Sequence, residues 1–122
     1  EYGDAQDTYE QYNLVDTDTA IVAYGGDEPV GCGCFKPYDG DSVELKRMYV
    51  DDARRGSGLG RTLLLALETW ARELGYRAMV LETGTRQHAA VALYERAGYT
   101  RIPLYPPYVG MALSICMRKL LT

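Results

Sequence analysis

Apolar residues gather in three short blocks in the first half of the chain, at positions 20–24, 30–36 and 43–50. Turn-forming residues separate the blocks, as in the Gly-Gly-Asp-Glu-Pro connection at 25–29. Short apolar blocks between turn residues predict β-strands, and the tight connections predict an antiparallel meander. Residues 1–19 are polar, and we expect an irregular segment there.

Helical spacing replaces this pattern after position 60. A helix is predicted over 62–74, because apolar residues recur every three or four positions: Leu63, Leu67, Trp70, Ala71 and Leu74. A second helix is predicted over 87–97, with one buried face: Ala90, Leu93, Tyr94 and Ala97. Gly75 and Gly98 stand where such helices end, and Gly75 is expected to be left-handed.

Further strands are predicted at 76–83, 99–102 and 111–120. A helix crossover joins 43–50 to 76–83, so these two strands are expected to run parallel. The element order β-β-β-α-β-α-β-β predicts an α/β (α+β) fold: a mixed, mainly antiparallel sheet with a central parallel pair, flanked by helices. A chain of 122 residues suits one domain, which we assign to 1–122.

The composition argues against two classes of protein, nucleic-acid binders and membrane-spanning proteins. A net charge of −4 argues against a general nucleic-acid binder. No apolar run approaches the roughly 20 residues of a membrane span, and the polar N-terminus is unlike a signal peptide. A cytoplasmic protein is therefore expected. The three cysteines are expected to be reduced, and Cys-x-Cys without a cysteine–histidine cluster is a weak metal signal.

The most informative stretch is Arg-Arg-Gly-Ser-Gly-Leu-Gly-Arg at 54–61, between a predicted strand and a predicted helix. Glycines let backbone N–H groups converge, the helix N-terminus adds partial positive charge, and arginines add full charge, so this stretch suits phosphate. Lys46 and Arg47 are counted with the same basic group. The spacing of the glycines excludes two other phosphate-binding motifs. The dinucleotide fingerprint is excluded because Arg61 stands in place of its third glycine, and the nucleoside-triphosphate loop is excluded because no Gly-Lys-Ser/Thr follows.

Three segments in order resemble the GNAT superfamily of N-acetyltransferases, over about residues 20–120. They are Glu-Leu-Lys-Arg-Met-Tyr-Val at 44–50, Arg-x-x-Gly-x-Gly at Arg55, Gly58 and Gly60, and the stretch at 87–99. The last is similar to the family's Asn-x-x-Ala-x-x-Leu-Tyr-x-x-x-Gly-Phe/Tyr. The family normally begins with a strand and one or two helices, for which 19 residues are too few. Either the chain was trimmed or the first strand is absent.

The resemblance implies acetyl-CoA as the co-substrate. Backbone groups of Met48, Tyr49 and Val50 would bind the pantetheine arm as a pseudo-strand. Seven consecutive residues would wrap the diphosphate: Arg55, Gly56, Ser57, Gly58, Leu59, Gly60 and Arg61. Gln87 stands where the family usually has an asparagine that contacts the cofactor arm.

Tyr94 occupies the position of the family's general acid. A phenol with a pKa near 10 stays protonated at pH 7 and can protonate a thiolate whose conjugate acid titrates at roughly 8.5. Simple packing is the alternative role for Tyr94. Glu44 is the candidate general base, directly or through water, and an exposed, ion-pairing glutamate is the alternative. Strand alternation is expected to put Glu44, Lys46 and Met48 on one face.

Glu82 and Thr83 close a strand and could face the acceptor, with a solvated strand edge as the alternative. Tyr105 and Tyr108 could line the amine pocket or only cover the core. The implied activity is acetyl transfer from acetyl-CoA to a primary amine of a small molecule or amino acid, by direct attack in a ternary complex without a metal. No nucleic-acid or membrane partner is expected, and a homodimer stays open. Two alternatives are a catalytically inactive acyl-CoA-binding sensor and a structural or dimerisation domain.

Overall fold

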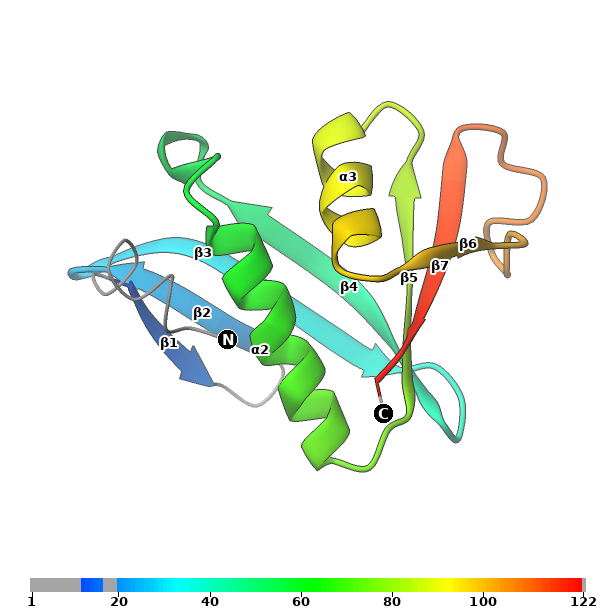
Figure 1. Ribbon diagram of the computed structural model, residues 1–122, viewed down its shortest axis with the longest axis horizontal. Helices are drawn as coiled ribbons and strands as arrows, with labels where there is room; N and C mark the ends of the chain where they lie inside the picture. Colours follow the sequence, from blue (N-terminus) through cyan, green and yellow to red (C-terminus); the bar gives the residue numbers. More distant parts are fainter. Residues whose placement is uncertain (1–11, 17–19, 122) are drawn as a thin grey trace.

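The computed structural model describes residues 12–16 and 20–121, which form a seven-stranded sheet and two α-helices (Figure 1). In chain order the elements are β1 (Tyr12–Asp16), β2 (Ala20–Gly25), β3 (Glu28–Pro37), β4 (Ser42–Val50), a 3₁₀-helix η1 (Asp52–Arg54), α2 (Leu59–Glu73), β5 (Ala78–Gly84), α3 (His88–Arg96), β6 (Thr100–Ile102) and β7 (Ser114–Leu120). Neither helix of this part of the chain is long and apolar enough to cross a membrane.

The sheet is antiparallel except at its centre. Its strand order is β1-β2-β3-β4-β5-β7-β6, in which β1 to β4 form the predicted meander. Strands β4 and β5 run parallel from the pair Ser42↔Ala78 to the pair Leu45↔Leu81, and α2 makes the crossover between them. The predicted mixed sheet with a central parallel pair is therefore confirmed.

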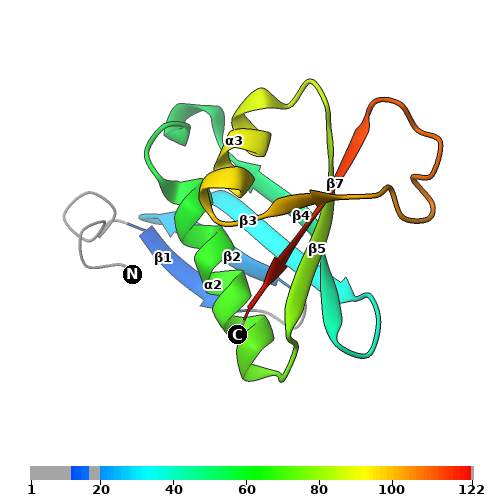
Figure 2. The ribbon, with the colours of Figure 1, turned by 45° about the vertical axis from the view of Figure 1, so that its right-hand side comes forward.

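Both helices cover the same face of the sheet (Figures 1 and 2). The core beneath them is built mainly from α2 and the central strands, and its fully buried members include Leu63, Leu64, Leu67, Val43 and Met79. From α3, Tyr94 is buried in this core, and partly buried residues pack against it on the predicted face: Ala90, Leu93 and Ala97. We call this the helix side of the sheet.

The opposite face, which we call the open face, carries a smaller apolar cluster. Val80, Tyr105 and Cys116 form it, with Ile102, Leu104 and Tyr108 packed against it. Tyr105 and Tyr108 come from the connection between β6 and β7. This connection therefore packs against the central strands on the side away from the helices.

Both helices end in the same type of cap. After α3, Gly98 has φ +103° and the Tyr99 N–H donates to the Tyr94 carbonyl oxygen over 3.0 Å. After α2, Gly75 has φ +96° and Tyr76 makes the corresponding backbone bond. These are Schellman caps, which require a left-handed residue. The left-handed glycine predicted after the first helix is confirmed.

Three expectations about local structure are wrong. Residues 12–16 are not irregular, because pairing with β2 along their whole length forms β1; the remainder of 1–19 lies outside the described residues. A strand therefore does precede β2. Helix α2 begins at Leu59 rather than 62, because the fully buried Leu59 side chain anchors its first turn in the core. Leu74 is 58% exposed, because the helix ends one residue earlier.

Candidate functional site

Strands β4 and β5 separate in the middle of the sheet (Figure 1). Their parallel pairing ends at Leu45↔Leu81, although β4 continues to Val50 and β5 to Gly84. Beyond Leu45, none of the described strands pairs with the edge of β4 that had faced β5. Unpaired backbone groups along a strand edge can bind an extended ligand as an additional strand.

A β-bulge lies where the two strands separate. The β3–β4 register shifts between Cys34 and Phe35, which leaves Lys46 without a partner in β3. An extra residue of this kind changes the alternation of the side chains that follow. Met48 therefore packs against the helix-side core, whereas Lys46 contacts Glu44 on the other face. The expectation that all three side chains share one face is wrong for Met48.

The connection from β4 to α2 contains the glycine turn, which we define as residues 55–61. Gly56 and Gly58 have φ of +82° and +88°, in the left-handed region that favours glycine. Gly58 is the N-cap of α2, and no side chain caps the helix there. The first backbone N–H groups of a helix lack intrahelical acceptors and lie at the positive end of its dipole. The turn can therefore receive an anion.

The arginines near the turn have different surroundings. Arg55 Nη2 lies 3.2 Å from Asp52 Oδ1 in an exposed ion pair, and Arg61 is exposed on the first turn of α2. Arg54 instead packs beside β2, with Nη2 3.2 Å from where a Cβ on Gly25 would lie. Its buried Nε has no hydrogen-bond partner among the described groups. Arg55 and Arg61 are thus the arginines left for an anion at the turn.

Three other residues of the turn, Ser57, Leu59 and Gly60, contribute to the fold. Leu59 is fully buried, and Ser57 Oγ donates to the Arg54 carbonyl oxygen. Gly60 lies in the first turn of α2, where an added Cβ would be 3.4 Å from Leu93 Cδ2 of α3. Leu59 and Gly60 can therefore contribute to a phosphate site only through the backbone.

Tyr94 is buried on the helix side. Its ring packs edge-to-face on Tyr99, with 5.8 Å between centroids and an interplanar angle of 63°. Burial raises the pKa of the Tyr94 hydroxyl above its ordinary value near 10. The phenol is therefore protonated at neutral pH, as a general acid must be, and its catalytic role stays a prediction.

Glu44 is buried on the open face, with 5% of its surface exposed. Tyr105 Oη donates to Glu44 Oε2 over 2.9 Å. Two ammonium groups approach the other oxygen, Oε1: Lys46 Nζ at 3.7 Å and Lys36 Nζ at 4.0 Å. Glu44 is therefore not the exposed glutamate of the alternative interpretation, although it does face a lysine on neighbouring β3.

Lys46 joins Glu44 to a second tyrosine. Its Nζ donates to Tyr108 Oη over 3.3 Å, and this bond, with the nearby carboxylates of Glu44 and Glu82, raises the pKa of Lys46. The Tyr105 and Tyr108 rings pack edge-to-face at 5.6 Å. We call Glu44, Lys46, Tyr105 and Tyr108 the open-face cluster. Counting Lys46 with the phosphate-binding charges was wrong, because its ammonium group contacts Glu44 and Tyr108 on the open face.

The remaining acceptor and cofactor candidates divide between the faces. Glu82 is two residues from Val80 on β5, so strand alternation puts it on the open face and Thr83 on the helix side. Gln87 is exposed just before α3, with Cγ 3.6 Å from where a Cβ on Gly84 would lie. Among the described contacts, Thr83 does not join the open-face cluster.

Tyr94 and Glu44 lie on opposite sides of the sheet. The first belongs to the helix-side core, and the second contacts Tyr105 on the open face. No hydrogen bond or ring contact within 20–121 joins Tyr94 to the open-face cluster. A substrate that met both residues would have to lie where β4 and β5 separate.

The described residues contain no group of three or more histidine, cysteine, aspartate or glutamate side chains placed to hold a metal ion. The cysteines are free: Cys32 and Cys34 are half-buried on β3, and Cys116 is buried. Burial raises the pKa of the Cys116 thiol, which belongs to the smaller apolar cluster on the open face.

The sequence model of the Acetyltransferase (GNAT) family matches residues 1–99. The chain belongs to the GNAT family. The match confirms the resemblance that rests on 44–50, the glycine turn and 87–99. It also fits the fold, since the glycine turn follows the strand that separates from its parallel neighbour.

Curated GNAT relatives are longer than this chain. An IAA acetyltransferase of Azospirillum brasilense is 38% identical over 100 residues, which are 81% of this chain and 65% of that protein. Two further curated N-acetyltransferases are 35% and 41% identical and are covered over 47% and 50% of their lengths. The chain thus spans about half to two thirds of these relatives.

Solved structures share the GNAT fold. One from Klebsiella pneumoniae, assigned as an acyl-CoA N-acyltransferase, has a TM-score of 0.80 at 40% identity, over 88% of this chain and 77% of that one. A GNAT acetyltransferase from Elizabethkingia anophelis with acetyl-CoA bound has a TM-score of 0.72 at 17% identity, over 98% and 83% of the two chains. The second likeness concerns the fold alone.

Proposed function

We propose that this GNAT chain transfers an acetyl group from acetyl-CoA to a primary amine of a small molecule or amino acid, by direct attack in a ternary complex. One observation carries the proposal: β4 has an edge that is unpaired beyond Leu45, and the next long element after it, α2, begins at a glycine with no side-chain cap. The strand edge suits an extended, amide-bearing arm, and the anion site that follows it along the chain suits a diphosphate.

The cofactor arm would extend along β4 at Met48, Tyr49 and Val50, through backbone hydrogen bonds. The diphosphate would bind the N–H groups of the glycine turn, with Arg55 exchanging its ion pair to Asp52 for the phosphate and Arg61 adding charge. Acetyl-CoA in the structure from Elizabethkingia anophelis, which has the same fold, supports this choice of co-substrate.

The chemistry assigned to Tyr94 is proton donation. Attack by a neutral amine on the thioester forms the new C–N bond, and the C–S bond breaks as coenzyme A leaves as a thiolate. The Tyr94 hydroxyl would donate its proton to that sulfur, and the proton lost by the newly acylated nitrogen would restore the phenol. Most of the rate would come from holding amine and thioester together.

Glu44 is proposed to accept the proton that the ammonium form of the acceptor must lose, through a water molecule. Tyr105 holds one carboxylate oxygen, so Oε1 is the oxygen that would face this water. The acceptor would approach on the open face, where Tyr108 and Glu82 lie near Lys46. Glu82 is suited to attract a cationic amine.

A second candidate function has a specific observation in its favour. Both oxygens of Glu44 already have protein partners, Tyr105 on one and two lysines near the other. A chain without a free base would bind an acyl-CoA and act as a sensor or regulatory module rather than turn it over.

Thiol release from acetyl-CoA tests both functions. The panel would contain small amines, amino acids, polyamines and peptide N-termini, and calorimetry would measure coenzyme A binding separately. Release above background with at least one amine supports the transferase. Binding without release from any acceptor favours the sensor, and absence of binding contradicts both.

A further inference from the structure

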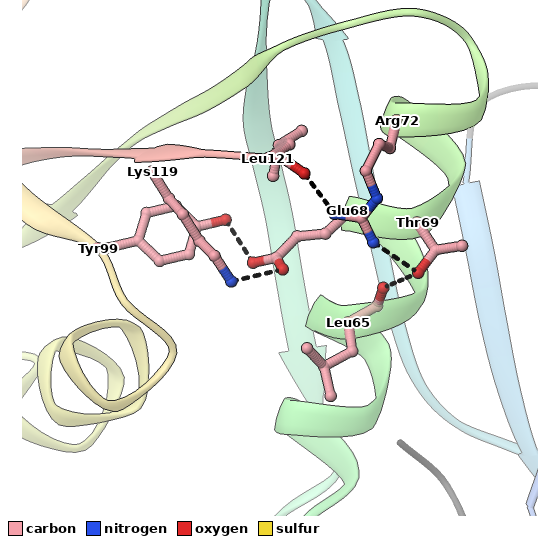
Figure 3. Close-up of polar contacts among 7 residues, drawn as sticks. All are labelled: Leu65, Glu68, Thr69, Arg72, Tyr99, Lys119 and Leu121. Carbon is pink, nitrogen blue, oxygen red and sulfur yellow. Dashed lines mark hydrogen bonds and ion pairs between the residues drawn. The ribbon is translucent and has the colours of Figure 1, made fainter.

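Glu68 is a buried carboxylate that the proposed chemistry does not use. It lies on the apolar face of α2 and is 2% exposed. Tyr99 Oη donates to Oε2 over 2.9 Å and Lys119 Nζ donates to Oε1 over 2.8 Å, so both oxygens are satisfied (Figure 3). A buried charge is costly unless it is paired in this way. The network joins α2, β7 and the residue just after the α3 cap.

Tyr99 connects this network to Tyr94. In the Schellman cap of α3, Tyr94 and Tyr99 occupy the two positions whose side chains commonly touch, and the Tyr99 N–H donates to the Tyr94 carbonyl oxygen. Their rings meet edge-to-face at 5.8 Å. The ring of Tyr94 therefore packs on a ring whose hydroxyl end is held by Glu68.

The Tyr99 ring is held at more than one point. Its hydroxyl is bonded to Glu68, its backbone is fixed by the cap, and Lys119 Nζ lies 5.8 Å from its centroid. With its orientation fixed, the ring limits how far Tyr94 can tilt. Displacement of a reacting group by about 1 Å can lower a rate by about 100-fold.

We propose that Glu68, Tyr99 and Lys119 are positioning residues that hold the Tyr94 ring in the orientation needed to reach the leaving sulfur. The proposal rests on the proposed role of Tyr94 as general acid. Glu68 acts through Tyr99, and none of the three residues touches the reacting atoms. The network thereby links the middle of α2 to the chemistry at α3.

The primary test is Tyr99→Phe, which removes the bond to Glu68 while keeping an aromatic ring at the cap. Tyr76→Phe is the matched control, because Tyr76 follows α2 at the same cap position and its hydroxyl has no described partner. We expect kcat of Tyr99→Phe to fall about tenfold, with KM for acetyl-CoA within about twofold of the parent. The control should keep the parent kcat.

A double-mutant cycle separates positioning from general loss of structure. If Tyr99 acts only through the Tyr94 hydroxyl, the Tyr94→Phe/Tyr99→Phe protein should turn over no more slowly than Tyr94→Phe. Glu68→Gln should lower kcat in the same way and show the same non-additivity. The proposal is overturned if the fold losses in kcat of the two single variants multiply in the double variant. It is also overturned if kcat of Tyr99→Phe is unchanged.

A spectroscopic readout is independent of turnover. The NMR signals of a ¹³C-labelled Tyr94 ring should shift or broaden in Tyr99→Phe and in Glu68→Gln, but not in Tyr76→Phe. Unchanged Tyr94 signals in both variants overturn the positioning role even if the parent shows no transferase activity. Conversely, shifted signals together with a fully active Tyr94→Phe protein contradict the proposed acid, and they overturn the claim that the network serves the leaving sulfur although they show the contact to Tyr94.

Discussion

The Tyr105 hydroxyl donates a 2.9 Å hydrogen bond to Glu44, although 61 positions separate the two residues in the chain. Tyr105 belongs to the connection between β6 and β7, and Glu44 lies on β4. The bond attaches this connection to the centre of the sheet. Whatever meets Glu44 on the open face therefore also meets the tyrosines of that connection.

Loss of this bond should destabilise the fold. Tyr105→Phe leaves one oxygen of a buried carboxylate without its donor, at a cost of about 1–3 kcal/mol in the free energy of unfolding. Urea denaturation followed by circular dichroism measures it. Tyr38→Phe is the control, because Tyr38 packs on the Tyr105 ring and is more exposed. Equal stabilities for the two variants would mean that the bond contributes nothing.

Charge at the glycine turn should control coenzyme A affinity. We expect Arg61→Gln to raise the dissociation constant about five- to tenfold at low salt and less at high salt, because salt screens exposed charges. Arg77→Gln serves as the control, since it follows the far end of α2, about 20 Å away at 1.5 Å per residue. Calorimetry at two salt concentrations checks this. A salt-independent effect, or one shared by Arg77→Gln, argues against a phosphate at the turn.

Removal of the Tyr94 hydroxyl should slow turnover while the fold is kept. Tyr94→Phe is expected to lower kcat about 100-fold or more, within the range for loss of a general acid. Burial raises the pKa of Tyr94, so the acid stays protonated and kcat of the parent should not fall through this group between pH 7 and about 10. The pH–rate profile of the parent checks the second point. A fall centred near pH 8 would point to another acid.

Alkaline pH should destabilise the protein through Tyr99. Burial and the neighbouring Glu68 raise the pKa of Tyr99 far above the value near 10 of an unfolded tyrosine. Stability from this group is therefore complete below pH 10 and is lost as pH rises above it, by up to about 1.4 kcal/mol per pH unit. Urea unfolding between pH 8 and 11 measures the slope.

Tyr99→Phe should make this alkaline dependence less steep. Tyr24→Phe is its control, because Tyr24 is only half-buried on β2 and has no described carboxylate partner. If the slope of the Tyr99→Phe protein matches that of the control, the titration of Tyr99 does not govern alkaline stability.

Much of the fold could be predicted because its signals are local. The spacing of Leu63, Leu67 and Ala71 predicts a helix with one buried face, and Gly75 marks its end, as found. Strand β1 could not be predicted in this way. Its residues are recognisable as a strand only through their pairing with β2.

Less of the candidate site than of the fold could be predicted from the sequence. Adjacent residues form the glycine turn, so its shape follows from local glycine conformations. The open-face cluster is assembled from β4 and a connection about 60 residues later. The Glu68 network was not predicted, although a signal existed: Glu68 comes four residues after Leu64 and three before Ala71, on the apolar face of the helix. A carboxylate at such a position requires buried donors.

The order of elements from β2 onward, the glycine turn and the family follow from the amino-acid sequence, because these depend on spacing within short segments. Tertiary structure was needed to place Met48 on the helix side, Arg54 beside Gly25, and Tyr99 between Glu68 and Tyr94. The last two placements join segments that are far apart in the sequence, and the first depends on the bulge between β3 and β4. A shift of one residue in a strand reverses which face its side chains occupy.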